Sequence, residues 1–243
     1  MSEVKKLFVV SDIHGHYSIL KSALENAGFE NENPNHLLVC CGDYFDRGVE
    51  NVQVLEFFEN LNHKVLLRGN HEDMLLRVLQ TGKMAPHNYK NGTKQTLESF
   101  FKGYSINEAD DTVDFCGKAD TIKRICKFIE STINYYETEN YFFIHGWLPE
   151  NAQTLEQIKN ATDADWAEAR RVLWTNKYNG IRPLESKTLV CGHMPTFFAT
   201  KFEPNRNPFN SEIFAKDGFY AIDAGTDDTK QINVLVLEEK FNA

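Results

Sequence analysis

A chain of 243 residues, of which 42% are hydrophobic and 25% charged, has the composition of an ordinary globular protein with a substantial core. Its formal net charge of −9 argues against general nucleic-acid binding, which normally requires a basic surface. Neither a signal peptide nor the roughly 18 apolar residues of a membrane-spanning helix can be recognised. We therefore expect a cytoplasmic protein that binds neither membranes nor nucleic acids in general.

Three consecutive segments share one pattern, in which an apolar strand leads through a polar loop into an amphipathic helix. The segments are "KKLFVVSD" with "IHGHYSILKSALENAG", "HLLVCCGD" with "YFDRG" and "VENVQVLEFFENL", and "HKVLLRGN" with "HEDMLLRVLQTG". The apolar spacing in the second part of each suits a helix, and Gly28 is expected to end the first one. Repeated strand–helix units predict an α/β fold with a largely parallel sheet and right-handed crossovers.

The middle of the chain, about residues 83–130, shows helical patterns but no residues of recognisable chemistry. We interpret it as a helical cap or insertion whose contacts help to select the substrate. Strand patterns return in "NYYETENYFFIHG", "KTLVCGH", "FYAIDAG" and "INVLVLEE". Because the sequence lacks repeats, low-complexity tracts and obvious linkers, one domain over residues 1–243 is predicted. Trp166 and Trp174 fall at helical spacing and are expected in the core.

Polar and charged residues gather directly after the apolar runs, where the predicted strands end. They are Asp12, His14, Asp43, Asp46, Arg47, Asn70, His71, His145 and His193. Asp12 and His14 taken alone favour a simple turn over a metal site. Five such loops flanked by glycine indicate a shared site, because ligands of open α/β sheets bind beyond the carboxyl ends of the strands.

The donor types in these loops suit divalent metal ions. Carboxylate, amide and imidazole groups without thiolates are typical ligands of manganese, iron or zinc. Two such ions lying roughly 3.5 to 4 Å apart need a bridging group, and the two oxygens of Asp43 make it the natural candidate. The 5 cysteines lack C-x-x-C spacing, so we predict reduced core thiols rather than metal ligands.

The blocks "SDIHG", "GDYFDRG", "GNHE", "HG" and "GH" resemble, in order and spacing, the signature blocks of the calcineurin-like metallophosphoesterases. The likeness is strongest to the bacterial and phage phosphoprotein phosphatases, and it spans Asp12 to His193. It implies a four-layer α/β/β/α sandwich, in which two mixed sheets face each other and helices flank them. Many phosphodiesterases of the superfamily carry "GHxH", whereas this chain has "GHMP", and Pro195 cannot bind a metal ion. That departure agrees with the phosphatase branch and its diadenosine tetraphosphatase relatives.

The resemblance also implies a role for each residue of the constellation. Asp12, His14 and Asp43 would hold one divalent ion, and Asp43, Asn70, His145 and His193 would hold the second. His71, oriented by Asp46, would be the general acid, and Arg47 would bind the substrate phosphate. Manganese is the expected metal, with iron or zinc as alternatives, and a metal-bridging hydroxide would attack phosphorus directly.

The implied enzyme is a metal-dependent phosphoric ester hydrolase with two open substrate classes. Phosphoserine and phosphothreonine in proteins come first, and symmetrical hydrolysis of diadenosine tetraphosphate is the alternative. A binding module that kept the fold and lost catalysis is disfavoured, because none of the expected site residues is missing. The oligomeric state is not indicated by the sequence.

Several other residues keep both a structural and a functional interpretation. Arg68 and Arg182 are candidates for phosphate contacts, although a structural ion pair, with Glu72 as the suggested partner, is favoured for Arg68. Four histidines outside the blocks are expected to be surface or capping residues. They are His16, His36, His63 and His87.

Overall fold

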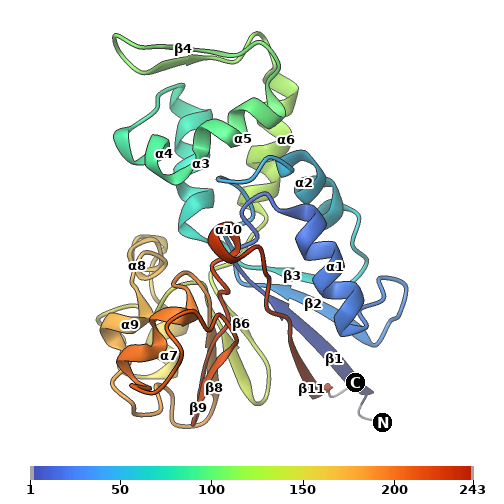
Figure 1. Cartoon of the computed structure of the whole chain (residues 1–243), viewed down its shortest axis with the longest axis vertical. Helices are drawn as coiled ribbons and strands as arrows, with labels where there is room; N and C mark the ends of the chain where they lie inside the picture. The colour runs from blue at the N-terminus through green and yellow to red at the C-terminus, as the bar shows by residue number, and fades with distance from the viewer. Residues whose placement is uncertain (1–2, 242–243) are drawn as a thin grey trace.

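The structure is a computed structural model that describes residues 3–241, and its two main β-sheets lie face to face (Figure 1). The first sheet has the strand order β11–β1–β2–β3. Its strands are β1 (Glu3–Val10), β2 (His36–Cys40), β3 (Lys64–Leu66) and β11 (Leu235–Phe241). β1, β2 and β3 run parallel, and β11 joins β1 antiparallel at the edge. The parallel part of this sheet is the product of the strand–helix repeats.

The second sheet has the strand order β6–β7–β8–β10–β9. Its strands are β6 (Tyr136–Glu137), β7 (Tyr141–Phe143), β8 (Thr188–Cys191), β9 (Phe214–Lys216) and β10 (Phe219–Ala221). β7, β8 and β10 run parallel, whereas β6 and β9 pair antiparallel at the two edges. Both sheets are therefore mixed, as the resemblance implied.

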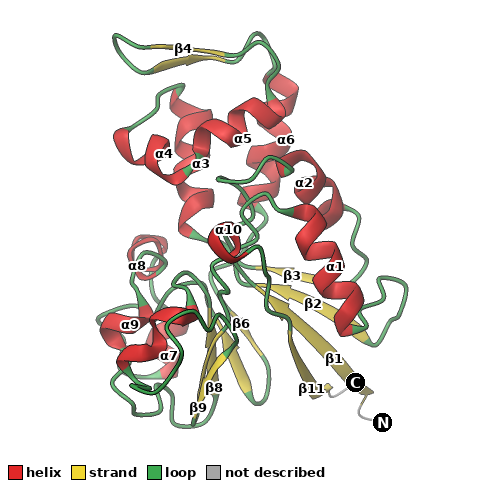
Figure 2. Ribbon diagram, in the orientation of Figure 1, coloured by secondary structure: helices red, strands yellow, loops and turns green. Residues whose placement is uncertain are grey.

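Side chains of the central strands alternate between two apolar layers, because successive residues of a strand face opposite sides of the sheet. In β1, Leu7 and Val9 pack between the two sheets, whereas Phe8 packs against the helices. In β7, Phe143 lies between the sheets and Phe142 lies under the helices of the second half. Figure 2 shows helices on both outer sides of the sheets. The four-layer α/β/β/α sandwich is confirmed.

The helices fall into two groups, one beside each sheet. The first group contains α1 (Tyr17–Ala27), α2 (Asn51–Glu59), α3 (Asn70–Thr81) and α6 (Ala119–Glu130). The second contains α7 (Leu155–Lys159), α8 (Asp163–Ala169), α9 (Trp174–Lys177) and the 3-10 helix η1 (Thr196–Lys201). The short α10 (Thr226–Thr229) lies between the two groups, where Thr226 Oγ1 donates to Asp12 O at 2.7 Å (Figure 1). Gly28 ends α1 in the left-handed conformation, with φ 81°, and Trp166 and Trp174 are buried, as expected.

The predicted helical insertion contains two further helices and an unexpected hairpin. They are α4 (Pro86–Asn91), α5 (Thr93–Phe100), β4 (Ser105–Asn107) and β5 (Thr112–Asp114). Strands of three residues offer too few alternations to be recognised in a sequence. Phe128 of α6 packs in the same core as Phe58 of α2, so the insertion shares the core of the first half. The single domain over residues 1–243 stays a prediction.

Two residues differ from what the sequence suggested. His36 is buried between Phe8 and Phe29, so it is not a surface residue, although its Nδ1 accepts the main-chain N–H of Glu30, a capping contact of the kind expected as the alternative. Cys116 is exposed, although the 5 cysteines are all free thiols, as predicted. No helix within residues 3–241 has both the length and the apolar character needed to cross a membrane.

Candidate metal centre

The loops after five strands meet at one place, at the carboxyl ends of both sheets. Asp12 and Asp43 follow β1 and β2, and Asn70 begins α3 shortly after β3. His145 and His193 follow β7 and β8 of the second sheet. His145 Nε2 lies 3.0 Å from Asn70 Oδ1 and 3.4 Å from Asp43 Oδ2, so the two sheets contribute to one site.

Backbone strain is concentrated in these loops. Nine non-glycine residues between positions 3 and 241 have positive φ, and six of them belong to the predicted site. The six are Asp12 (55°), His14 (48°), Asp43 (58°), Asp46 (72°), Arg47 (63°) and His193 (68°). Such conformations cost on the order of 1–3 kcal/mol each and persist only where the surrounding structure fixes them. The loops are thus bent, at a cost in stability, into the shape that gathers these side chains.

Main-chain carbonyl groups orient two of the histidine rings. His14 Nδ1 donates to Phe45 O at 2.9 Å, and His145 Nδ1 donates to Cys41 O at 2.7 Å. Because a carbonyl only accepts, each Nδ1 carries a proton and each Nε2 is left to face the site. This is the usual arrangement of a histidine that binds a metal ion. Burial opposes a charge on His145, but Asp43 outweighs it and raises the pKa of His145 to about 9, so a metal ion would have to displace a proton from its Nε2.

His193 supplies the strongest indication of a cation. Its Nε2 is buried and has no hydrogen-bond partner among the residues described. Burial and the neighbouring His145 lower the pKa of His193 to about 3, and burial and Arg47 lower the pKa of His14 well below its usual value. A buried lone pair without a partner is costly, and metal ligands must be deprotonated. The donor set therefore fits a metal ion.

Asp43 lies at the centre of the donor cluster. Its Oδ2 is 3.8 Å from His14 Nε2 and 3.9 Å from His71 Nε2, in addition to the contact with His145. Burial opposes charge on this carboxylate, but His145 and His71 outweigh it and hold the pKa of Asp43 well below its usual value. Two sets of candidate ligands, one with His14 and His71 and one with His145 and His193, have Asp43 in common.

Asp12 borders the first set without belonging to it. Its Oδ2 accepts Ser11 Oγ at 2.5 Å and the main-chain N–H of His193 at 2.9 Å. Its Oδ1 remains 3.9 Å from His14 Nε2. One oxygen of Asp12 is thus tied to the loop of the second sheet, and the other faces the histidine that the sequence predicted as its fellow ligand.

His71 faces the same space as His14. Its Nδ1 donates to Asp46 Oδ2 at 2.8 Å, which leaves Nε2 towards Asp43. Burial opposes a charge on the ring, but Asp43 and Asp46 outweigh it and raise the pKa of His71. A raised pKa favours a proton donor over a ligand, whereas the distances allow both. The ligand set and the general acid therefore stay predictions.

Glu72, for which the sequence suggested no role in the site, ties two of its loops together. Its Oε2 accepts the main-chain N–H groups of Asp43 at 2.9 Å and Gly69 at 2.8 Å. Its Oε1 accepts the main-chain N–H of Tyr44 at 2.9 Å. Burial and Asp43 raise the pKa of Glu72 to about 7. Its place in the block "GNHE" was the only signal available.

We expect Glu72→Gln to lower the free energy of unfolding by about 1–3 kcal/mol, because its amide group would leave a buried main-chain N–H without an acceptor. Denaturant unfolding measures this loss. The variant should also bind manganese about 10- to 100-fold more weakly in a metal titration, since its loops carry candidate ligands. Glu25→Gln, at an exposed position of α1, is the control and should change neither quantity. Wild-type behaviour of Glu72→Gln would mean that other contacts hold the loops.

Asp223 is a further buried acid that the sequence analysis missed. It lies just beyond β10, and its Oδ1 accepts the main-chain N–H of Gly225 at 2.7 Å. Burial and Asp12 raise its pKa well above the usual value, against the opposing charge of Arg47. It follows the same rule as the predicted residues, because an apolar strand pattern directly precedes it.

Arg47 lies at the site, because its charge acts on both His14 and Asp223. Arg182 lies elsewhere: its side chain packs on Gly218, which precedes β10 at the end of that strand opposite to the site. A phosphate contact is therefore open to Arg47 and not to Arg182.

Arg68 has a structural role, but not with the suggested partner. Its Nη1 lies 3.8 Å from Asp73 Oδ1, and its Nη2 donates to Ile129 O at 2.7 Å. Glu72 is fully engaged by the main-chain N–H groups of the site loops and is not available to it.

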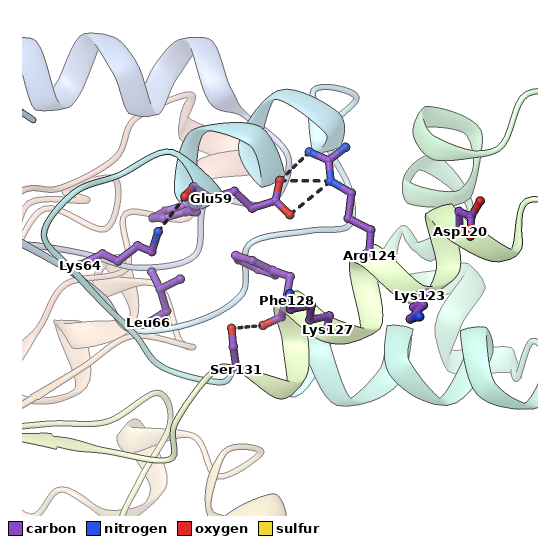
Figure 3. Close-up of a pocket in the computed structure, with 10 residues that line it drawn as sticks. Glu59, Lys64, Leu66, Asp120, Lys123, Arg124, Lys127, Phe128 and Ser131 are labelled. Atoms are coloured by element: carbon purple, nitrogen blue, oxygen red, sulfur yellow. Dashed lines mark hydrogen bonds and ion pairs between the residues drawn. The ribbon is translucent and has the colours of Figure 1, made fainter.

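A separate cavity of about 470 Å³ lies between α2, β3 and α6 (Figure 3). Arg124 pairs with Glu59 there, and the Lys64 amine donates to Glu59 O at 2.9 Å and Leu61 O at 3.1 Å. These carbonyls lie at the C-terminal end of α2, where a cation is favourable. The cavity lining contains no histidine, so it lacks the donors gathered at the strand ends.

Comparison with known proteins gives a family match over most of the chain. The model of the calcineurin-like phosphoesterase family matches residues 5–223. Over 131 residues the chain is 38% identical to serine/threonine-protein phosphatase 2 of Escherichia coli (strain K12), which covers 54% of this chain and 56% of that protein. The protein of the same name from Salmonella typhimurium is 27% identical over 199 residues, or 82% of this chain and 84% of the relative.

A second kind of relative matches a shorter part of the chain. The symmetrical bis(5'-nucleosyl)-tetraphosphatase of Coxiella burnetii is 27% identical over 95 residues, 39% of this chain and 32% of the relative. Among solved structures, a protein serine/threonine phosphatase from Saccharomyces cerevisiae superposes with a TM-score of 0.56 over 98% of this chain and 81% of the other, at 14% identity. At that identity the likeness shows the fold alone.

Proposed function

Because this chain belongs to the calcineurin-like phosphoesterase family, we propose that it hydrolyses phosphomonoesters and acts on phosphoserine and phosphothreonine in proteins. It is a hydrolase of phosphoesters, as the sequence predicted. The substrate proposal is carried by one observation. The likeness to serine/threonine-protein phosphatase 2 extends over 84% of the Salmonella protein, whereas the likeness to the tetraphosphatase covers 32% of that relative. Symmetrical hydrolysis of diadenosine tetraphosphate is therefore the second candidate.

Two divalent ions are proposed at the strand ends. The ligands of the first would be Asp12, His14 and Asp43, and those of the second would be Asp43, Asn70, His145 and His193. The shared Asp43 and the unpartnered Nε2 of His193 support this division. Manganese suits the oxygen donors, with iron or zinc as alternatives that the imidazoles would also accept. The ions would supply Lewis acidity, which activates water near neutral pH and polarises a phosphoryl oxygen.

The remaining residues would bind the substrate and move a proton. The planar guanidinium of Arg47 matches two phosphate oxygens. His71 would donate a proton from Nε2 to the leaving oxygen, because its Nδ1 is held by Asp46. Free thiols at all 5 cysteines support our placement of the protein in the reducing cytoplasm.

Arg47→Ala is expected to weaken inhibition by inorganic phosphate roughly 10- to 100-fold, the effect of losing a charged contact worth about 1.5–3 kcal/mol. Its metal content should match the wild type, since arginine is not a ligand here. Arg182→Ala serves as the control and should leave the inhibition constant unchanged. Equal inhibition of Arg47→Ala and wild type would remove Arg47 from the phosphate site.

The substrate class can be decided by a manganese-supplemented comparison of a phosphoserine peptide, p-nitrophenyl phosphate and diadenosine tetraphosphate. We expect release of phosphate from the peptide and from p-nitrophenyl phosphate, with kcat/KM highest on the peptide. Conversion of diadenosine tetraphosphate to two molecules of ADP, with little peptide hydrolysis, would favour the second candidate instead.

A further inference from the structure

The carboxylate of Asp46 is held by two threonine side chains of the insertion. Thr96 Oγ1 donates to Asp46 Oδ1 at 2.8 Å, and Thr93 Oγ1 donates to Asp46 Oδ2 at 3.1 Å. His71 Nδ1 donates to the same Oδ2, and all four side chains are buried. The residue that would orient the general acid is thus fixed from α5, 47 and 50 residues further along the chain.

The surrounding donors set the direction of both hydroxyl groups. The main-chain N–H of Asp46 donates to Thr96 Oγ1 at 2.8 Å, and Asn88 Nδ2 donates to Thr93 Oγ1 at 3.4 Å. An N–H group only donates, so the hydroxyl protons themselves are left for the carboxylate. The Thr96 hydroxyl therefore contacts Asp46 twice, because it accepts the main-chain N–H of Asp46 and donates to the Asp46 carboxylate.

The same turn of the insertion supports the strained loop beside it. Gly92 O accepts the main-chain N–H of Arg47 at 3.3 Å, and a Cβ added to Gly92, which has φ 86°, would meet the main chain of Arg47. Asp46 and Arg47 have φ of 72° and 63°, conformations that persist only when neighbours fix them. Residues 92–96 are therefore in direct contact with the loop that carries the partner of the acid.

We propose that Thr96 and Thr93 are positioning residues of the phosphoesterase reaction, which fix Asp46 and, through it, the imidazole of His71. The inference rests on the proposed role of His71. It adds that the insertion contributes to catalysis and not only to substrate selection. Small misplacements of a catalytic group are costly, because catalysis depends on near-attack geometry. Since a proton donor acts in the transition state, its misplacement lowers kcat and leaves KM unchanged.

Thr96→Val preserves the shape of the side chain and removes its hydroxyl. On phenyl phosphate, whose leaving group needs a proton, we expect kcat to fall about 10- to 100-fold at constant KM and metal content. On p-nitrophenyl phosphate, which releases a stable anion, kcat should stay within roughly threefold of wild type. Thr96→Ser restores the hydroxyl and should recover most of the activity. Thr93→Val removes one hydrogen bond to Asp46, whereas Thr96→Val removes two, so it should show the same selectivity more weakly.

Thr138 offers a matched control for the loss of a buried hydroxyl. Its Oγ1 donates to the buried Glu239 at 2.5 Å and accepts the main-chain N–H of Tyr141 at 3.1 Å, as Thr96 does with Asp46. It precedes β7, at the end of that strand opposite to His145. Thr138→Val should lower the melting temperature about as much as Thr96→Val and leave the ratio of the two kcat values unchanged.

Equal losses of Thr96→Val on the two esters, or loss of its metal, would overturn the proposal and give the threonines a structural role only. His71→Asn measured on the same esters distinguishes a failure of the positioning role from a failure of the general-acid role of His71. If His71→Asn discriminates between the esters and Thr96→Val does not, only the positioning role fails. If neither discriminates, the role of His71 fails first. Should Thr96→Val not fold, Thr93→Val decides the question in the same assay.

Discussion

Asp43→Asn should lose both metal ions together, and turnover with them. Oδ2 of Asp43 lies 3.4 Å from His145 Nε2 and 3.8 Å from His14 Nε2, so the same carboxylate borders both candidate ligand sets. An amide replaces one anionic oxygen by an N–H donor, which repels a cation. Metal analysis of the purified variant should give well below two ions per chain. Losing the Lewis acid removes several kcal/mol of transition-state stabilisation, so kcat/KM should fall by at least about a thousandfold.

Asp12→Asn is the comparison that shows whether Asp43 is shared between the two ions. Asp12 is proposed for one ion only, and its other oxygen is engaged by Ser11 and by the main-chain N–H of His193. Asp12→Asn should therefore retain close to one ion per chain. Two ions and normal turnover in Asp43→Asn would show that this carboxylate bridges nothing, and an equal loss in both variants would mean that the ions bind as one unit.

Residues that directly follow a strand could be recognised from the sequence. Asp12 and Asp43 each follow an apolar run, and the carboxyl ends of parallel strands meet at one edge of a sheet, so their convergence needed no long-range information. Asp223 obeys the same rule and was missed. Asp223 accepts the main-chain N–H of Gly225, two residues further on, as an aspartate at the start of an ordinary turn does. The sequence pattern of such a turn is the same as that of a site residue, so the two could not be told apart.

The supports of these residues could not be recognised in the same way. Thr96 meets Asp46 across 50 residues, because α5 packs on α2 in the folded chain, and no periodic pattern encodes that contact. Polar residues at the start of α5 suggest only an ordinary helix beginning. The sequence suggested a salt bridge between Glu72 and Arg68, because the two residues are close along the chain. In the structure Glu72 instead accepts three main-chain N–H groups, and no sequence pattern indicates such a role.

The division of the strands into two sheets could not be predicted from the periodicity of apolar residues either. The run "LFVV" in β1 is apolar on both faces, which indicates burial on both sides and does not say whether a helix or a sheet covers each one. Leu7 faces the second sheet and Phe8 faces helices, yet both are simply apolar in the sequence. Only the family resemblance supplied the four layers.

His71→Asn should separate the proton donor from the metal centre. His71 follows Asn70 directly, its Nδ1 is occupied by Asp46 at 2.8 Å, and its Nε2 faces Asp43 at 3.9 Å. A serine alkoxide must be protonated as it leaves, whereas p-nitrophenolate is already stable near neutral pH. The variant should retain both metal ions and lose on the order of 10²- to 10⁴-fold in kcat on a phosphoserine peptide. It should lose clearly less on p-nitrophenyl phosphate.

Asp46→Asn tests the same assignment from the other side of the ring. It keeps His71 but weakens the hydrogen bond that orients it, so the same substrate selectivity should appear with a smaller loss on the peptide. Metal analysis of both variants decides between the two roles that the distances allow, because His71 also falls within the candidate ligand set of His14 and Asp43. If His71→Asn sheds one ion, or loses activity equally on both substrates, the histidine is a ligand or a structural residue and the general acid must be sought elsewhere.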